Sequence, residues 1–109
     1  MPQFRDLKFL ETPSGQIPFF EWYDSLKDRR ARRIITDKLR LLQNAEFEGY
    51  KSVGHGIFEL RIFYGPGFRI YFAFENMQVV VAVGGGDKSS QRADIDRAVS
   101  LWSRHKNAS

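Results

Sequence analysis

The chain contains no cysteine and only two histidines among its 109 residues. The absence of cysteine excludes a disulfide framework, a thiol nucleophile and a zinc finger. No apolar run approaches the roughly 18 residues of a membrane-spanning helix, and residues 1–6 lack the apolar core of a signal peptide. These absences predict a cytoplasmic protein without a membrane partner, and no motif in the sequence indicates a cofactor or a metal site.

The sequence does contain enough apolar material for a packed core, together with a small excess of positive charge. Apolar residues make up 42% of the chain, including ten phenylalanines, so bulk disorder is not expected. The length fits one domain over residues 1–109, without repeats or linkers. Seventeen Lys and Arg against thirteen Asp and Glu give a net charge of +4, which slightly favours an anionic partner.

The first half of the chain is expected to form one strand and a helical hairpin. Residues 4–10 read as a strand that ends at the turn cluster 12–15. A helix is expected to begin near Pro18, because proline is well tolerated at the first helical position. Asp28 is a candidate cap for a second helix of about 16 residues. Apolar residues recur at helical spacing in both helices: Phe19, Trp22, Tyr23 and Leu26, then Ile34, Ile35, Leu39, Leu41 and Leu42.

The second half of the chain is expected to form a sheet followed by a helix. A loop over residues 49–56 leads to two strands joined by a hairpin, and the valine-rich segment 78–84 forms the next strand. A last helix starts near Ser89 or Ser90, with an apolar face of Ile95, Ala98, Val99 and Trp102. The order predicts an α+β fold in which an N-terminal strand and a helical hairpin pack on an antiparallel sheet, with a C-terminal helix.

The two strands of the hairpin sort their polar side chains onto one face, because successive side chains of a strand point to opposite sides. The polar face holds Glu59, Arg61, Phe63, Arg69 and Tyr71, and the apolar face holds Phe58, Leu60, Ile62, Phe68, Ile70 and Phe72. A three-residue loop over 65–67 would place Arg61 opposite Tyr71 and one diagonal step from Arg69. We therefore expect both arginines to converge on one phosphate at a solvent-reachable surface.

Three sequence elements of this region occur together and in order in one superfamily of proteins. They are GIFELRI at residues 56–62, GPGFRIYF at 65–72 and GGDKSSQ at 85–91, followed by Asp94, Ile95 and Ala98. On these elements the chain resembles the RelE/ParE superfamily of type II toxins, and most closely its short HigB-like addiction module killer branch. The resemblance implies a RelE-like fold and a toxin that cleaves mRNA, commonly on the ribosome. It also implies a cognate antitoxin, for which we expect a helix-turn-helix protein.

The polar face suits RNA cleavage without a metal, in which the ribose 2′-hydroxyl attacks the adjacent phosphate. Arginine presents a planar fork to phosphate oxygens and stabilises the charge that develops on them. We assign Arg61 and Arg69 to this clamp. Tyr71 is expected to orient the ribose or to stack on a base, and Lys88 to hold a neighbouring phosphate or donate a proton. Supporting or RNA-binding candidates are Lys51, Glu59, Gln91, Arg29, Arg30 and Arg33, and Glu59 is expected to pair with one of the arginines of the clamp.

The general base, the surface arginines and the target each leave alternatives open. No histidine falls on the polar face, and His55, in the loop before it, is either a possible base or an ordinary solvated side chain. The basic run at residues 27–33 either follows an RNA backbone or forms the solvated face of the second helix. One alternative function is that of a ParE-like toxin, which inhibits DNA gyrase without cutting RNA, since fold does not determine function. Another, if the general base is absent, is an inactive nucleic-acid-binding domain.

Overall fold

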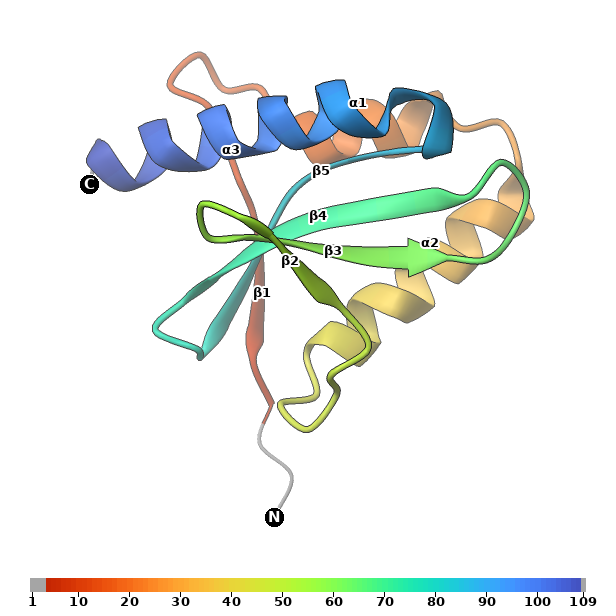
Figure 1. Cartoon of the computed structure of the whole chain (residues 1–109), viewed down its shortest axis with the longest axis horizontal. Helices are drawn as coiled ribbons and strands as arrows, with labels where there is room; N and C mark the ends of the chain where they lie inside the picture. Colours follow the sequence, from red (N-terminus) through yellow and green to blue (C-terminus); the bar gives the residue numbers. More distant parts are fainter. Residues whose placement is uncertain (1–3, 109) are drawn as a thin grey trace.

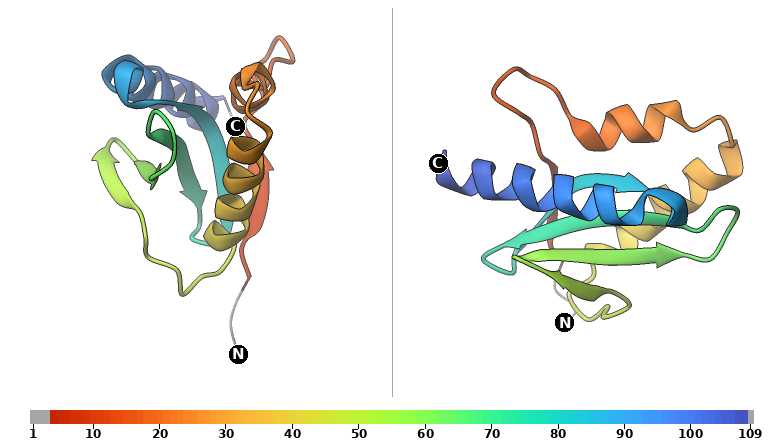
Figure 2. Two further views of the ribbon diagram at one scale, coloured as in Figure 1. Left: turned by 90° about the vertical axis from the view of Figure 1, so that its right-hand side faces the viewer. Right: turned by 45° about the horizontal axis from the view of Figure 1, so that its top comes forward.

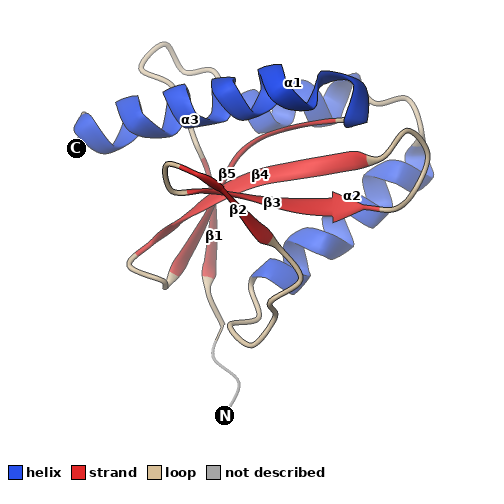
Figure 3. Ribbon diagram, viewed as in Figure 1, coloured by secondary structure: helices blue, strands red, loops and turns tan. Residues whose placement is uncertain are grey.

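A five-stranded sheet forms the centre of the protein, and helices pack on both of its faces (Figures 1 and 3). The structure, a computed structural model, describes residues 4–108. The ends of the predicted domain, residues 1–3 and 109, lie outside the described residues, and so does half of the segment 1–6 that was expected to lack a signal-peptide core. Its elements are β1 (Asp6–Phe9), α1 (Pro18–Ser25), α2 (Arg29–Leu42), β2 (Lys51–Gly54), β3 (Ile57–Ile62), β4 (Phe68–Glu75), β5 (Val79–Gly86), the 3₁₀ turn η1 (Lys88–Ser90) and α3 (Gln91–Asn107). In residues 4–108, no helix combines the length and the apolar character needed to span a bilayer.

The sheet has the strand order β1-β5-β4-β3-β2 and confirms the α+β class, with two corrections. First, β1 pairs in parallel with β5, so the sheet is mixed and not wholly antiparallel. Second, the predicted loop over residues 49–56 contains a strand, β2, which pairs antiparallel with β3. The sequence KSVG of β2 shows no apolar alternation because this short strand lies at the edge of the sheet, with two residues exposed and two only partly buried.

Helices α1 and α2 pack on the face formed by the even-numbered residues of β3 and β4. Their buried side chains join the strands in one apolar cluster: Phe19, Ala31, Ile35, Leu39, Leu42, Leu60, Ile62, Phe68, Ile70, Phe72, Val80 and Ala82. Both predicted helix starts are confirmed. Pro18 opens α1, and the Asp28 carboxylate caps α2 by accepting hydrogen bonds from the backbone N–H groups of Arg30 (2.9 Å) and Ala31 (3.1 Å).

Helix α3 crosses the opposite face of the sheet, which is the face that carries the predicted polar residues (Figure 2). Ala98 and Trp102 of α3 pack there on Ile57, Tyr71, Ala73, Val81 and Val83. The sequence therefore assigned the two faces of the hairpin correctly, but the polar face is only partly open. The uncovered part lies beside β2 and the β3–β4 loop, where α3 begins.

The glycines that end β5 allow a helix to approach the sheet closely on each face. A Cβ atom at Gly85 would fall within the ring of Trp22 from α1, and one at Gly86 would overlap the Asp94 carboxylate of α3. These glycines continue the strand, which was predicted to end at Gly84.

Replacing Gly85 with alanine is expected to lower the free energy of unfolding by about 1–3 kcal/mol, because the new methyl group displaces the Trp22 ring from its packing site. Urea denaturation followed by circular dichroism measures this change. Gly84→Ala is the matched control, since a Cβ atom there meets no atom within 4 Å. Equal unfolding midpoints for the two variants would show that the packing of the Trp22 ring does not require glycine at position 85.

Candidate functional site

The β3–β4 hairpin carries the predicted site residues in a register that differs from the expected one. Arg61 pairs directly with Arg69, and Glu59 pairs with Tyr71, because the hairpin closes at Ile62 and Phe68. The connecting loop is therefore residues 63–67 and not 65–67. The observed pairing of β3 with β4 is shifted by two residues from the expected pairing, because Arg61 lies opposite Arg69 and not Tyr71. A shift by an even number of residues leaves every side chain on its predicted face.

Contacts within the loop account for this register. Tyr64 leaves the ladder, and its hydroxyl donates a hydrogen bond to the Asp28 carboxylate at the start of α2 (2.8 Å). The Tyr64 carbonyl then accepts a hydrogen bond from the Gly67 N–H group inside the loop (3.2 Å). A contact with a helix distant in the sequence thus stabilises the longer loop.

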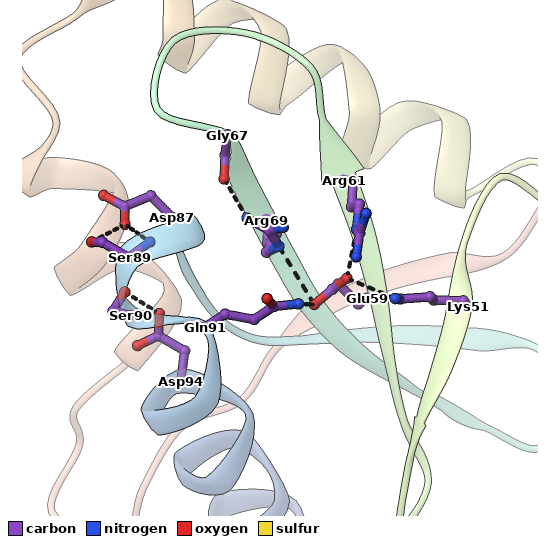
Figure 4. A network of polar contacts seen from close by, with 10 residues as sticks. All are labelled: Lys51, Glu59, Arg61, Gly67, Arg69, Asp87, Ser89, Ser90, Gln91 and Asp94. Atoms are coloured by element: carbon purple, nitrogen blue, oxygen red, sulfur yellow. Dashed lines mark hydrogen bonds and ion pairs between the residues drawn. The ribbon is translucent and has the colours of Figure 1, made fainter.

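The carboxylate of Glu59 is the centre of the site (Figure 4). Its side chain has no exposed surface. Arg61 Nε donates a hydrogen bond to Oε1 at 3.2 Å, and Gln91 Nε2 donates one to Oε2 at 2.8 Å. Arg69 Nε lies 3.6 Å from Oε2, and Lys51 Nζ lies 3.8 Å from Oε1. We call these five residues the Glu59 cluster.

The Glu59 cluster combines one buried anion with three cations, so it leaves excess positive charge at the surface. Burial alone would raise the pKa of Glu59. The hydrogen bonds from Gln91 and Arg61 and the charges of Lys51 and Arg69 outweigh burial, and the pKa is held below its ordinary value. Glu59 is therefore ionised at neutral pH and forms ion pairs with both arginines, where a pair with one of them was expected.

The two arginines differ in exposure. The side chain of Arg61 is 44% exposed and that of Lys51 54%, whereas that of Arg69 is only 7% exposed. Arg69 Nη1 donates a hydrogen bond to the Gly67 carbonyl (2.8 Å), so this arginine ties the loop to the cluster. The expectation that both guanidinium groups reach solvent is therefore wrong for Arg69, because the hairpin loop and the start of α3 enclose it.

Tyr71 is fully buried beneath α3, in the cluster that contains Trp102. Burial raises the pKa of its hydroxyl, and the nearby carboxylates of Glu59 and Asp94 raise it further. No hydrogen-bond partner for this hydroxyl occurs within residues 4–108. The structure thus places Tyr71 under the cluster, where its ring cannot stack on a base or contact a ribose.

Lys88 opens η1 and contacts the β3–β4 loop through its backbone and Cβ. Its N–H group donates a hydrogen bond to the Pro66 carbonyl (3.4 Å), and its Cβ lies 3.6 Å from where a side chain at Gly67 would begin. Lys88 therefore borders the loop that Arg69 holds. Asp87 caps η1 by accepting a hydrogen bond from the Ser89 N–H group (2.9 Å), which makes this segment a strand-to-helix junction.

The structure does not bring His55 into the Glu59 cluster. His55 lies in the turn between β2 and β3, where its neighbour Gly56 packs against the indole of Trp102. Trp102 is three turns further along α3 than Gln91, about 16 Å at 1.5 Å per residue. His55 is thus at the far end of β3 from Arg61 and is not placed to act on the same phosphate.

The predicted basic run is divided between two places. Arg29 and Arg33 line a shallow groove on α2, on the other side of the sheet from the Glu59 cluster. The guanidinium of Arg30 instead stacks over the Tyr64 ring, 5.6 Å from its centre, and so contacts the β3–β4 loop. Only Arg30 is therefore linked to the site.

Sequence reasoning did not assign a role to Phe63, which is 93% exposed at the start of the β3–β4 loop. It borders an open cleft of about 310 Å³ lined by Glu48, Gly49, Tyr50, Lys51, Glu59, Arg61 and Phe63. The signal was present, because strand alternation places Phe63 on the polar face beside Arg61.

Within residues 4–108 no three acidic or histidine side chains gather as a metal site would require.

Comparison with known proteins identifies the family. Residues 21–101, which include the whole Glu59 cluster, match the family described as Phage derived protein Gp49-like (DUF891). A protein of Haemophilus influenzae (strain ATCC 51907 / DSM 11121 / KW20 / Rd), described as an uncharacterized protein, is 43% identical over 82 residues, which cover 75% of this chain and 83% of the relative. Gp49-like proteins are part of the RelE/HigB-like toxin superfamily, which indicates a toxin of a toxin–antitoxin pair with a cognate antitoxin as partner. The chain therefore belongs to the phage-derived Gp49-like family within that superfamily.

Proposed function

We propose that the protein is a HigB-like toxin of a type II toxin–antitoxin system that cleaves mRNA on the ribosome, with the Glu59 cluster as its active site. The observation that carries this proposal is the position of Arg61. Its guanidinium is half-exposed beside an open cleft and is oriented by a buried carboxylate. A guanidinium held in this way is preorganised to bind a phosphate oxygen.

In the proposed reaction the ribose 2′-oxygen attacks the adjacent phosphorus. The bond from phosphorus to the 2′-oxygen forms, the bond to the 5′-oxygen breaks, and the products are a 2′,3′-cyclic phosphate and a 5′-hydroxyl. Arg61 and Lys51 stabilise the negative charge on the phosphate oxygens. Lys88 donates a proton to the leaving 5′-oxygen, and water in the ribosomal complex accepts the proton of the 2′-hydroxyl.

Arg69 and Gln91 act as positioning residues in this proposal. Both contact the Glu59 oxygen that Arg61 does not use, so they fix the carboxylate while Arg61 remains free toward the cleft. Tyr71 supports the cluster from below. The antitoxin, which we propose to be a helix-turn-helix protein, would silence the toxin.

Arg61→Ala is expected to reduce mRNA cleavage by about 100-fold or more, since one group that stabilises transition-state charge contributes that much. The wild type and the variant are expressed in bacterial cells, and the 5′ ends of transcripts are mapped. Cuts within translated codons should appear with the wild type and disappear with the variant. Arg104→Ala is the matched control, because this exposed arginine lies at the other end of α3 and its loss should leave cleavage unchanged.

A different outcome would overturn the nuclease proposal. Growth arrest with intact transcripts and broken DNA would instead favour a ParE-like toxin that inhibits DNA gyrase. In vitro, programmed ribosomes with and without the protein test where the cut is made. Cleavage of the same mRNA at equal rates without ribosomes would contradict ribosome dependence but retain the nuclease.

A further inference from the structure

We propose that Phe63 forms a stacking subsite for an unpaired RNA base next to the phosphate that Arg61 binds, an inference that rests on the proposed function. Phe63 is the most exposed large apolar side chain in residues 4–108. Eight of the ten phenylalanines contact another aromatic ring, and within the described residues only Phe4 and Phe63 do not. An aromatic ring left open in this way is available to a flat ligand.

The surroundings of Phe63 favour RNA as the source of that ligand. Phe63 follows Arg61 by two residues on the same face, and both side chains line the open cleft with Lys51. Exposed cations next to an exposed aromatic ring are the two elements by which proteins bind single-stranded nucleic acid. The cations take the backbone, and the ring takes a base.

The loop that carries Phe63 is held in place on both sides. The adjacent residue, Tyr64, donates its hydroxyl to Asp28 (2.8 Å) and packs its ring under the guanidinium of Arg30. At the other end of the loop, Arg69 holds the Gly67 carbonyl (2.8 Å). The ring is therefore presented from an ordered loop, which reduces the entropy lost on binding. Because every base has a stacking face, this subsite should accept all four bases.

Binding of an uncleavable RNA isolates the subsite from the reaction. The probe is a fluorescent single-stranded oligoribonucleotide with 2′-O-methyl groups, and its Kd is measured by anisotropy at several salt concentrations. Phe63→Ala is expected to weaken binding about 5- to 140-fold, the range for loss of one stacked base. Phe63→Trp should bind like the wild type, and Phe63→Leu should bind like Phe63→Ala because leucine is apolar but cannot stack.

Salt dependence separates the base contact from the phosphate contact. Phe63→Ala should leave the slope of log Kd against log salt unchanged, whereas Arg61→Ala should reduce its magnitude by about 1. Wild-type affinity in Phe63→Ala, wild-type affinity in Phe63→Leu, or failure of the wild type to bind the probe would each overturn the inference.

The outcome for the subsite can be told apart from the outcome for the proposed function. If Arg61-dependent cuts occur in cells while Phe63→Ala binds the probe normally, the nuclease stands and the stacking subsite fails. If Phe63→Ala loses only its affinity for the cognate antitoxin and keeps RNA binding, Phe63 belongs to a protein interface and the inference is overturned. Absence of any cuts by the wild type removes the proposed function first, and the inference with it.

Discussion

Replacing Glu59 with glutamine is expected to lower the free energy of unfolding by about 3–5 kcal/mol, because it leaves the charge of Arg69 buried without a counterion. For a domain of this size each kcal/mol corresponds to about 4–8 °C, so the unfolding temperature should fall by about 12 °C or more. Thermal and urea unfolding measure both quantities. The variant should also cleave RNA more slowly, since the neutral amide of glutamine has one acceptor oxygen and holds the Arg61 guanidinium more weakly than the carboxylate does.

The dependence of this effect on pH provides an internal control. The pKa of Glu59 is lower in the folded protein than in the unfolded chain. At pH values between these two pKa values, the folded state therefore binds fewer protons than the unfolded state. The contribution of the Glu59 charge to the free energy of unfolding is complete above the ordinary pKa of 4.5, and it is lost as the pH falls through the pKa of the folded state. The wild type and Glu59→Gln should therefore converge in stability in acid. A constant difference across that window, or an equal loss in the exposed control Glu46→Gln, would contradict the role of the charge.

Phe72→Ala is expected to lower the free energy of unfolding by about 3–5 kcal/mol, the usual range for removing a buried phenylalanine ring. Phe72 has no exposed surface. Its ring stacks on Phe58 at 5.8 Å and meets Tyr50 and Phe74 edge-on at 5.3 Å and 5.5 Å, so its loss opens a cavity between β3, β4 and the segment before β2. Denaturant unfolding gives the magnitude.

The matched control for Phe72→Ala is Phe63→Ala on the same hairpin. Phe63 faces solvent, so its removal should change stability by no more than about 0.5 kcal/mol. The two variants are expected to be opposites, one altering stability and the other RNA binding. A large loss of stability in Phe63→Ala would mean that the loop residue supports the fold, which would also weaken the case for a stacking subsite.

Features that depend on neighbours in the sequence could be predicted from it. Strand alternation assigned Glu59, Arg61 and Arg69 to one face because the period of a strand is a local property. The start of α1 at Pro18 and the cap of α2 at Asp28 were predicted for the same reason. The family resemblance was recognised from short elements of the same kind, and the Gp49-like match confirms it at the level of the superfamily.

Features that depend on distant contacts could not be predicted. The longer loop is stabilised by the hydrogen bond between Tyr64 and Asp28, which are far apart in the sequence. Tyr71 is buried where α3 crosses the sheet, and Arg69 is enclosed by the β3–β4 loop and the start of α3. Strand β1 pairs with β5, which follows it by more than half of the chain. Strand alternation predicts which face a side chain lies on but not which elements cover that face. The sequence could therefore not show that Arg61, and not Arg69, remains open to a ligand.

The parallel pairing of β1 with β5 affects how the protein folds during its translation. Residues 6–9 find their partners only at residues 79–82, so a nascent chain must be extended for roughly 4–14 s at 5–20 residues per second before the sheet can close. Gln91, which completes the Glu59 cluster, emerges later still. The Glu59 cluster can therefore form only after residue 91 has been translated, well after its other four members.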